Sequence, residues 1–146
     1  MNSFMQMAID AAQRAAQRAE VPVGAVVVRG DEVLAVAHNH TETDNDPTAH
    51  AEMLAIREAC KKIGSKRLSE CDLYVTLEPC AMCAQAISHA HIRRLYFGAL
   101  DPKGGGVEHG ARIFSQPTCH HKPEIYGGIA ENQCGQMLRD FFKARR

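Results

Sequence analysis

The amino-acid sequence predicts an α/β fold in which helices cover both faces of one sheet. Three observations support this class. Strand-like and helix-like patterns alternate along the chain after an opening hairpin. The length of 146 residues suits one compact domain. No repeat, low-complexity segment or linker divides the chain, so we expect residues 1–146 to form a single domain.

The first part of the chain predicts a helix followed by a β-hairpin. Alanines and larger apolar residues recur every three or four positions in residues 4–19, which is the pattern of an amphipathic helix. Because most of these side chains are small, the helix should lie close against a sheet. Residues 23–28 are β-branched and apolar, as in a strand covered on both faces. A turn at Gly30-Asp31 leads to a second strand at residues 33–38.

The rest of the chain alternates between helix and strand. A helix is predicted over residues 48–63, with Gly64 as its stop signal. Residues 73–77 are typical of a buried strand, and Pro79 stands where the next helix, over residues 80–89, can begin. After a strand at residues 93–98 come a glycine-rich loop at 101–106 and an irregular stretch to Pro123. A short strand at residues 125–126 and a helix over 132–144 complete the prediction.

Composition limits the classes of protein that the chain can represent. Seventeen basic residues balance seventeen acidic ones, so any contact with an anionic polymer must come from a local patch. The start of the chain lacks the pattern of a signal peptide, and no apolar run is long enough to cross a bilayer. We therefore expect a cytoplasmic protein without a membrane partner. In that compartment the six cysteines are better interpreted as metal ligands or buried thiols than as disulfides.

Two short motifs, each at the predicted start of a helix, indicate a metal site. Residues 50–52 read H-A-E, and residues 79–83 read P-C-A-M-C. Two cysteines three positions apart lie on one helix face, where both sulfurs can reach one ion. The positive end of the helix favours the thiolate form that binds metal. Since zinc prefers thiolate and imidazole ligands, we expect His50, Cys80 and Cys83 to hold one Zn²⁺ per chain.

The number of ligands favours a catalytic site over a structural one. Structural zinc sites usually have four protein ligands, whereas catalytic sites have three and leave one position open for water. Glu52 is then the candidate acid–base group. It lies about 200° around an ideal helix from His50, so the two side chains can converge only at the first helical turn. We therefore expect the site at the tip of this helix.

These motifs resemble the signature of the cytidine-deaminase-like superfamily of zinc deaminases, H-x-E followed by P-C-x-x-C. Within that superfamily the sequence is similar to the bacterial tRNA-specific adenosine deaminases over nearly its whole length. The stretches that carry this resemblance are residues 20–25 (EVPVGA), Asn39, residues 46–52 (DPTAHAE), residues 76–83 (TLEPCAMC), residues 97–101 (FGALD) and Phe141-Phe142.

The resemblance implies a specific fold and reaction. The fold would be a three-layer α/β/α arrangement with a central, mixed five-stranded sheet. The reaction would be hydrolytic deamination of adenosine to inosine at the wobble position of a tRNA anticodon stem-loop, by zinc-activated water with Glu52 as the proton shuttle. Asn39 would hydrogen-bond the base, Ala51 would offer a backbone amide near it, and Asp101 would lie near the substrate backbone. The resemblance also implies a homodimer.

Other interpretations of the sequence remain open. A deaminase of a free base or nucleotide, such as guanine, cytosine or deoxycytidylate, would share the zinc chemistry. A non-catalytic zinc scaffold would not need Glu52. Asn39 and Asp101 also suit turns at the ends of strands. Residues 119–121 (C-H-H) lack the partner spacing of a second metal site. Candidate phosphate contacts are Arg93, Arg94, Lys103, Lys143, Arg145 and Arg146.

Overall fold

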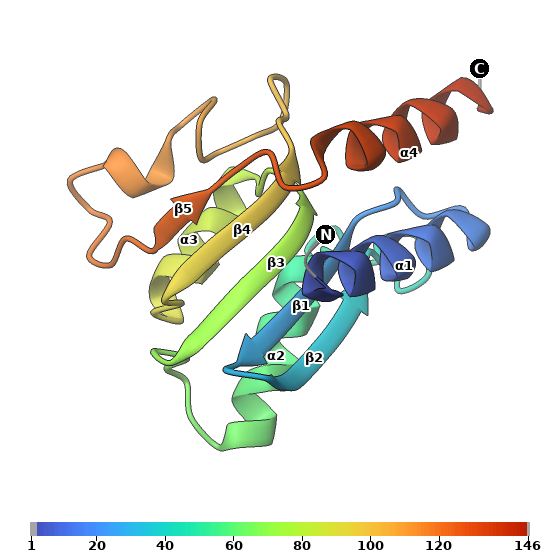
Figure 1. The fold of residues 1–146 in the computed structure, drawn as a ribbon. Helices are drawn as coiled ribbons and strands as arrows, with labels where there is room; N and C mark the ends of the chain where they lie inside the picture. The colour runs from blue at the N-terminus through green and yellow to red at the C-terminus, as the bar shows by residue number, and fades with distance from the viewer. Residues whose placement is uncertain (1–2, 146) are drawn as a thin grey trace.

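The computed structural model describes residues 3–145 and contains one five-stranded sheet (Figure 1). The strand order is β2-β1-β3-β4-β5. β1 pairs antiparallel with both β2 and β3, whereas β4 runs parallel to β3 and to β5. This confirms the predicted mixed sheet. The strands are β1 (Gly24–Arg29), β2 (Glu32–His38), β3 (Cys71–Leu77), β4 (Arg94–Ala99) and β5 (Glu124–Tyr126).

Helices cover both faces of the sheet, which confirms the three-layer prediction. α2 and α3 pack on one face, and α1 and α4 lie on the other (Figure 1). Alternate residues of each strand supply the two apolar layers because successive side chains point to opposite faces. Val27 of β1, for example, belongs to the core under α2 and α3, while its neighbour Val26 packs with α1. The helices are α1 (Ser3–Gln17), α2 (Ala51–Ile63), α3 (Ala81–His89) and α4 (Glu131–Lys143).

The small side chains of α1 allow it to approach the sheet closely, as predicted. Ala8 and Ala12 are fully buried, and their backbone contacts Gly24 at the start of β1. A Cβ atom at Gly24 would overlap the carbonyl oxygen of Ala8. Close packing of this helix therefore depends on a glycine in the strand as well as on alanines in the helix.

Two local features differ from the sequence-based prediction. The second helix begins at Ala51 instead of residue 48, because the Asp46 carboxylate accepts hydrogen bonds from the backbone and hydroxyl of Thr48 and holds this segment in a turn. The irregular stretch contains a 3₁₀ turn, Ile113–Ser115, which places Phe114 in the core. The predicted end of α2 is confirmed, since Gly64 caps it in the left-handed conformation with φ 69°. None of the described helices combines the length and hydrophobicity that a membrane span requires.

Candidate active site

The three predicted ligands meet where two helices begin. His50 is the N-cap of α2 and Cys80 is the N-cap of α3, with Cys83 in the first turn of α3. The Nδ1 atom of His50 lies 3.6 Å from Cys80 Sγ and 3.5 Å from Cys83 Sγ. These three ligand atoms all lie within 4.8 Å of one another. The structure thus brings together residues that are 30 and 33 positions apart.

This geometry fits a zinc ion. With usual Zn–N and Zn–S bond lengths, a tetrahedral centre separates a nitrogen ligand from a sulfur ligand by about 3.6 Å. The two distances from Nδ1 agree with that value. Among residues 3–145, no other group of three histidine, cysteine or acidic side chains was found with its ligand atoms this close. The set supplies three protein ligands and leaves one tetrahedral position for water or substrate.

Hydrogen bonding between the two cysteines shifts their pKa values in opposite directions. A hydrogen bond from Cys83, supported by one from His50, lowers the pKa of Cys80 to about 4 against the effect of burial. The bond to Cys80, together with burial, raises the pKa of Cys83. Cys80 is therefore the more acidic of the two thiols. Because a metal needs both sulfurs as thiolates, its binding would displace the remaining thiol protons.

Glu52 lies beside the ligands without belonging to the ligand set. It is the second residue of α2, only 4% of it is exposed, and its side chain hydrogen-bonds with Cys83. Burial, together with the nearby Cys80 side chain, raises the pKa of Glu52 to about 7. A carboxyl group with a pKa near neutrality can both accept and deliver a proton. This arrangement agrees with the expectation that the site forms at the tip of the helix.

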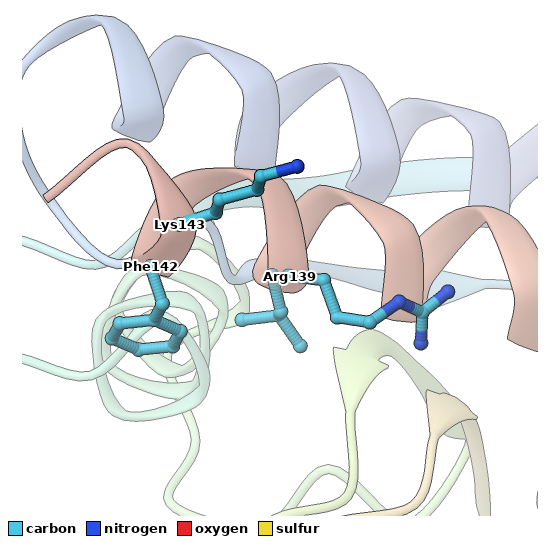
Figure 2. A pocket seen from close by; sticks show the side chains of 4 residues that line it. Arg139, Phe142 and Lys143 are labelled. Atoms are coloured by element: carbon cyan, nitrogen blue, oxygen red, sulfur yellow. The ribbon is translucent and has the colours of Figure 1, made fainter. Parts of the chain in front are cut away.

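A cavity of about 310 Å³ opens beside these groups. It includes His50, Glu52 and Cys80, and Val21, Val23 and Leu77 form its apolar part. A groove along α4 has a larger volume, about 400 Å³, but shares no residue with the metal site (Figure 2). The chemistry of the lining side chains identifies the smaller cavity as the active-site candidate.

Two of the three candidate substrate-binding residues line this cavity, and the third, Ala51, is hydrogen-bonded to one of them. The side chains of Asn39 and Asp101 line it. Asn39 Oδ1 accepts a hydrogen bond of 2.8 Å from the backbone N–H of Ala51. Asp101 Oδ1 accepts hydrogen bonds from the backbone of Lys103 and Gly104, so part of this carboxylate shapes its own loop.

Other residues considered in the sequence have structural partners. Arg93 forms two hydrogen bonds with Asp72, and Arg94 pairs with Glu124. These contacts weaken both arginines as candidate phosphate ligands. In the C-H-H segment, Cys119 Sγ hydrogen-bonds with Ser88 and with the carbonyl oxygen of His121, and His121 Nε2 contacts the carbonyl oxygen of Ile92. This segment is therefore fastened to α3 and to the start of β4. Arg146 lies outside the described residues.

Sequence reasoning assigned no role to two buried acidic residues near the cavity. Glu20 and Glu78 are 0% and 2% exposed. Both belong to stretches that carry the family resemblance, EVPVGA and TLEPC. The sequence does show that each glutamate stands next to the apolar residues of a strand, which indicates burial. The hydrogen-bond partners of Glu20 and Glu78 are distant in sequence, however, and could not be predicted.

The fold and the site together define a class of protein. A three-layer α/β/α domain with a histidine and two cysteines at helix starts, and a buried glutamate beside them, is a zinc-dependent hydrolytic deaminase.

Comparisons with known proteins agree with this class and narrow it. The cytidine and deoxycytidylate deaminase zinc-binding region matches residues 1–99. A tRNA-specific adenosine deaminase from Agrobacterium fabrum is 57% identical, over 98% of this chain and 94% of that protein. A solved structure from a study of A-to-I editing by tRNA:A34 deaminases is also 57% identical, with a TM-score of 0.92, over 93% of this chain and 99% of that one. A guanine deaminase structure from Bacillus subtilis is 31% identical, with a TM-score of 0.68, over 99% and 94% of the two chains.

The chain therefore belongs to the zinc-binding cytidine and deoxycytidylate deaminase family and, within it, to the tRNA-specific adenosine deaminases.

Proposed function

We propose that this protein deaminates the wobble adenosine of a tRNA anticodon stem-loop to inosine. The observation that carries the proposal is the incomplete ligand set of His50, Cys80 and Cys83 beside the buried carboxyl group of Glu52. The high identity to tRNA-specific adenosine deaminases supports the choice of substrate.

In the proposed reaction the chain's own residues bind, orient and move protons. Zinc, held by the three ligands, supplies Lewis-acid chemistry that lowers the pKa of water. Glu52 takes one proton from the attacking water and passes it to the adenine ring. It then takes the second proton from the hydroxyl that has been added to the ring carbon and delivers it to the leaving amine, which departs as ammonia. Its pKa of about 7 suits both steps.

Asn39 and the cavity wall are proposed to orient the base. Because Asn39 Oδ1 is held by the Ala51 N–H, the donor end of the same amide is left for a ring acceptor. The apolar side chains of Val21, Val23 and Leu77 suit contact with a flat base that has left its stack. Loop nucleotides are suitable targets, because sequence-specific RNA recognition mostly uses unpaired bases.

The groove along α4 is a candidate contact for the rest of the RNA. It is lined by Leu138, Arg139, Phe142 and Lys143, and Phe142 is 49% exposed. Figure 2 shows Phe142 and Arg139 projecting from the same side of this helix. A second groove, which shares Leu138 and Arg139, reaches Leu100 and Pro102 on either side of the cavity residue Asp101. Cations and an exposed aromatic ring suit phosphates and unpaired bases.

The substrate assignment can be tested with a synthetic anticodon stem-loop. Purified protein should convert adenosine at the wobble position to inosine, as measured by nucleoside chromatography. The controls are the same stem-loop with adenosine moved to another loop position, and free guanine, cytosine and deoxycytidylate. The 31% identity to a guanine deaminase makes guanine the most informative of these. Turnover of a free base alone would contradict the tRNA assignment.

Three further parts of the proposal await their own measurements. We propose that the chain is a homodimer, that it acts in the cytoplasm, and that residues 1–146 form one domain. Light scattering on the purified protein tests the dimer, and cell fractionation tests the compartment. A single cooperative unfolding transition, seen by two different probes, tests the domain.

A further inference from the structure

Glu20 and Glu78 are buried carboxylates that the proposed chemistry does not use. Removing a carboxylate from water is costly unless hydrogen bonds replace its hydration. Each carboxylate receives several hydrogen bonds. The donors to Glu20 come from one loop beside the substrate cavity, and the donors to Glu78 come from another.

Glu78 holds the loop that contains Asp101. Its Oε1 atom accepts a hydrogen bond of 3.0 Å from the Asp101 N–H and one of 2.8 Å from His109 Nδ1. Its Oε2 atom accepts hydrogen bonds from three successive backbone N–H groups, at Val107, Glu108 and His109, with distances from 2.9 to 3.1 Å. One carboxylate therefore binds both ends of the segment 101–109.

Two glycines show how closely this loop approaches its support. A Cβ atom at Gly105 would overlap the carboxylate of Glu78, and one at Gly106 would lie 2.5 Å from the backbone nitrogen of Ala81 in α3. The Gly106 N–H also donates to the carbonyl oxygen of Pro79. The loop is thus built directly against Glu78 and the start of α3, next to Cys80.

Glu20 does the same for a loop on another side of the cavity. Its Oε1 accepts a hydrogen bond of 3.1 Å from the Glu42 N–H, and its Oε2 accepts bonds of 2.6 Å from both the N–H and the hydroxyl of Thr43. Thr41, which lines the cavity, also donates to Glu20 Oε1. This loop connects Asn39 at the end of β2 to the segment that leads into α2.

We propose that Glu78 and Glu20 are positioning residues, each of which fixes one wall of the substrate cavity by gathering the backbone N–H groups of that wall. The proposal rests on the proposed function, since it concerns how the same cavity receives its substrate. Neither carboxylate touches the reacting atoms; each acts through the loop that it holds.

The contacts require a carboxylate in particular. An ionised carboxylate offers only acceptors, whereas an amide of equal size replaces one oxygen with a donor. All five groups that contact Glu78 are donors, and they occupy both of its carboxylate oxygens, so an amide nitrogen at either position would face a donor. At Glu20, burial would raise the pKa, but the hydrogen bonds from Thr43 and Glu42 outweigh it and lower the pKa, so this group is charged at neutral pH.

The test uses Glu78→Gln and Glu20→Gln in the zinc-loaded protein, with Leu68→Ala as a control. Leu68 is fully buried in the core and lines no part of the cavity, so its truncation reduces stability without affecting either loop. We expect Glu78→Gln to speed hydrogen exchange at residues 101 and 107–109, and Glu20→Gln to speed it at residues 42 and 43. Each glutamine variant is a control for the other, because each should change hydrogen exchange only in its own loop.

Kinetics on the anticodon stem-loop should show a change in substrate binding. We expect each glutamine variant to keep one zinc per chain and to raise KM about tenfold, with kcat changed by less than about threefold. Leu68→Ala should lower Tm and leave KM unchanged. If Glu78→Gln does not fold, Gly105→Ala keeps the carboxylate and displaces the same loop, so it should reproduce the rise in KM.

Several results would overturn the proposal. One is unchanged exchange at the named amides, and another is an unchanged KM when exchange has increased. Loss of zinc from a glutamine variant would mean that the carboxylate acts on the metal site instead. Failure of the proposed function appears separately, as a wild-type protein inactive on the stem-loop. In that case the role of the two carboxylates would be decided by hydrogen exchange at the named amides and by the KM for whichever free base the protein deaminates.

Discussion

Replacing Glu52 with glutamine should separate metal binding from catalysis. Glutamine keeps the size of the side chain but cannot carry the proton between water, ring and leaving amine. General acid–base catalysis typically contributes about 10²–10⁴ in rate, which corresponds to about 2.7–5.4 kcal/mol of transition-state stabilisation. We expect the loss to lie at the upper end, because the other carboxylates that line the cavity are occupied. Glu78 receives five hydrogen bonds, and Asp101 binds its own loop.

The assay is single-turnover conversion of the stem-loop by wild-type and Glu52→Gln protein, with zinc measured by atomic spectroscopy on the same samples. Zinc should remain at one per chain, because Glu52 is outside the ligand set. A variant that loses its zinc would show that Glu52 is a ligand. A rate reduced by less than about tenfold would show that another group moves the protons.

Three further predictions concern stability and the metal. Cys80→Ser places a preferred N-cap residue at the start of α3, so the metal-free protein should gain about 0.5–2 kcal/mol. The stabilisation by added zinc should fall, as urea unfolding with and without chelator would measure. Glu20→Gln should cost about 1.5–3 kcal/mol at pH 7. Since the folded-state pKa of Glu20 is below its ordinary 4.5, this difference is present above pH 4.5 and disappears as pH falls through the lowered value; a constant difference would refute the charge. Gly98→Ala brings a Cβ atom within 2.5 Å of Cys134 Sγ and 2.6 Å of the Thr76 carbonyl oxygen. Overpacking of this kind should cost about 1–3 kcal/mol, seen as a lower Tm with unchanged zinc content.

The sequence predicted the sheet and the ligands because the signals for both are local. Apolar periodicity, Gly64 and Pro79 mark the ends of elements within a few residues of themselves. In the same way, the three-residue spacing of Cys80 and Cys83 is enough to predict that both side chains lie on one face of the helix. Even the position of Glu52 followed from helix geometry, since the structure places it and His50 at the first turn of α2.

The walls of the cavity could not be predicted because their contacts are distant in sequence. The Glu78 carboxylate is 23 to 31 positions from the amides that it binds, and Glu20 is 22 to 23 positions from its own backbone donors. The 3₁₀ turn was missed for a related reason, as Phe114 is fixed by the core and not by its neighbours in sequence. Contacts between residues that are distant in sequence cannot be inferred from a local pattern of residue types.

The starts of α2 and α3 show how the fold and the metal depend on each other. Serine, threonine, aspartate and asparagine are the usual N-cap residues, and alanine in their place costs about 1 kcal/mol. Here the caps are His50 and Cys80, and neither side chain makes a capping hydrogen bond. The two helix starts lie close together, with His50 Nδ1 3.6 Å from Cys80 Sγ, and the Ala51 N–H of α2 is satisfied by Asn39 Oδ1 instead of by its N-cap residue. The side chains that could have capped each helix instead face one another as ligands, and their thiolate is favoured by the positive helix ends. Zinc held by these ligands would join two helix starts whose own N-cap side chains make no capping hydrogen bond, so we expect the stability of this edge of the fold to depend on the metal.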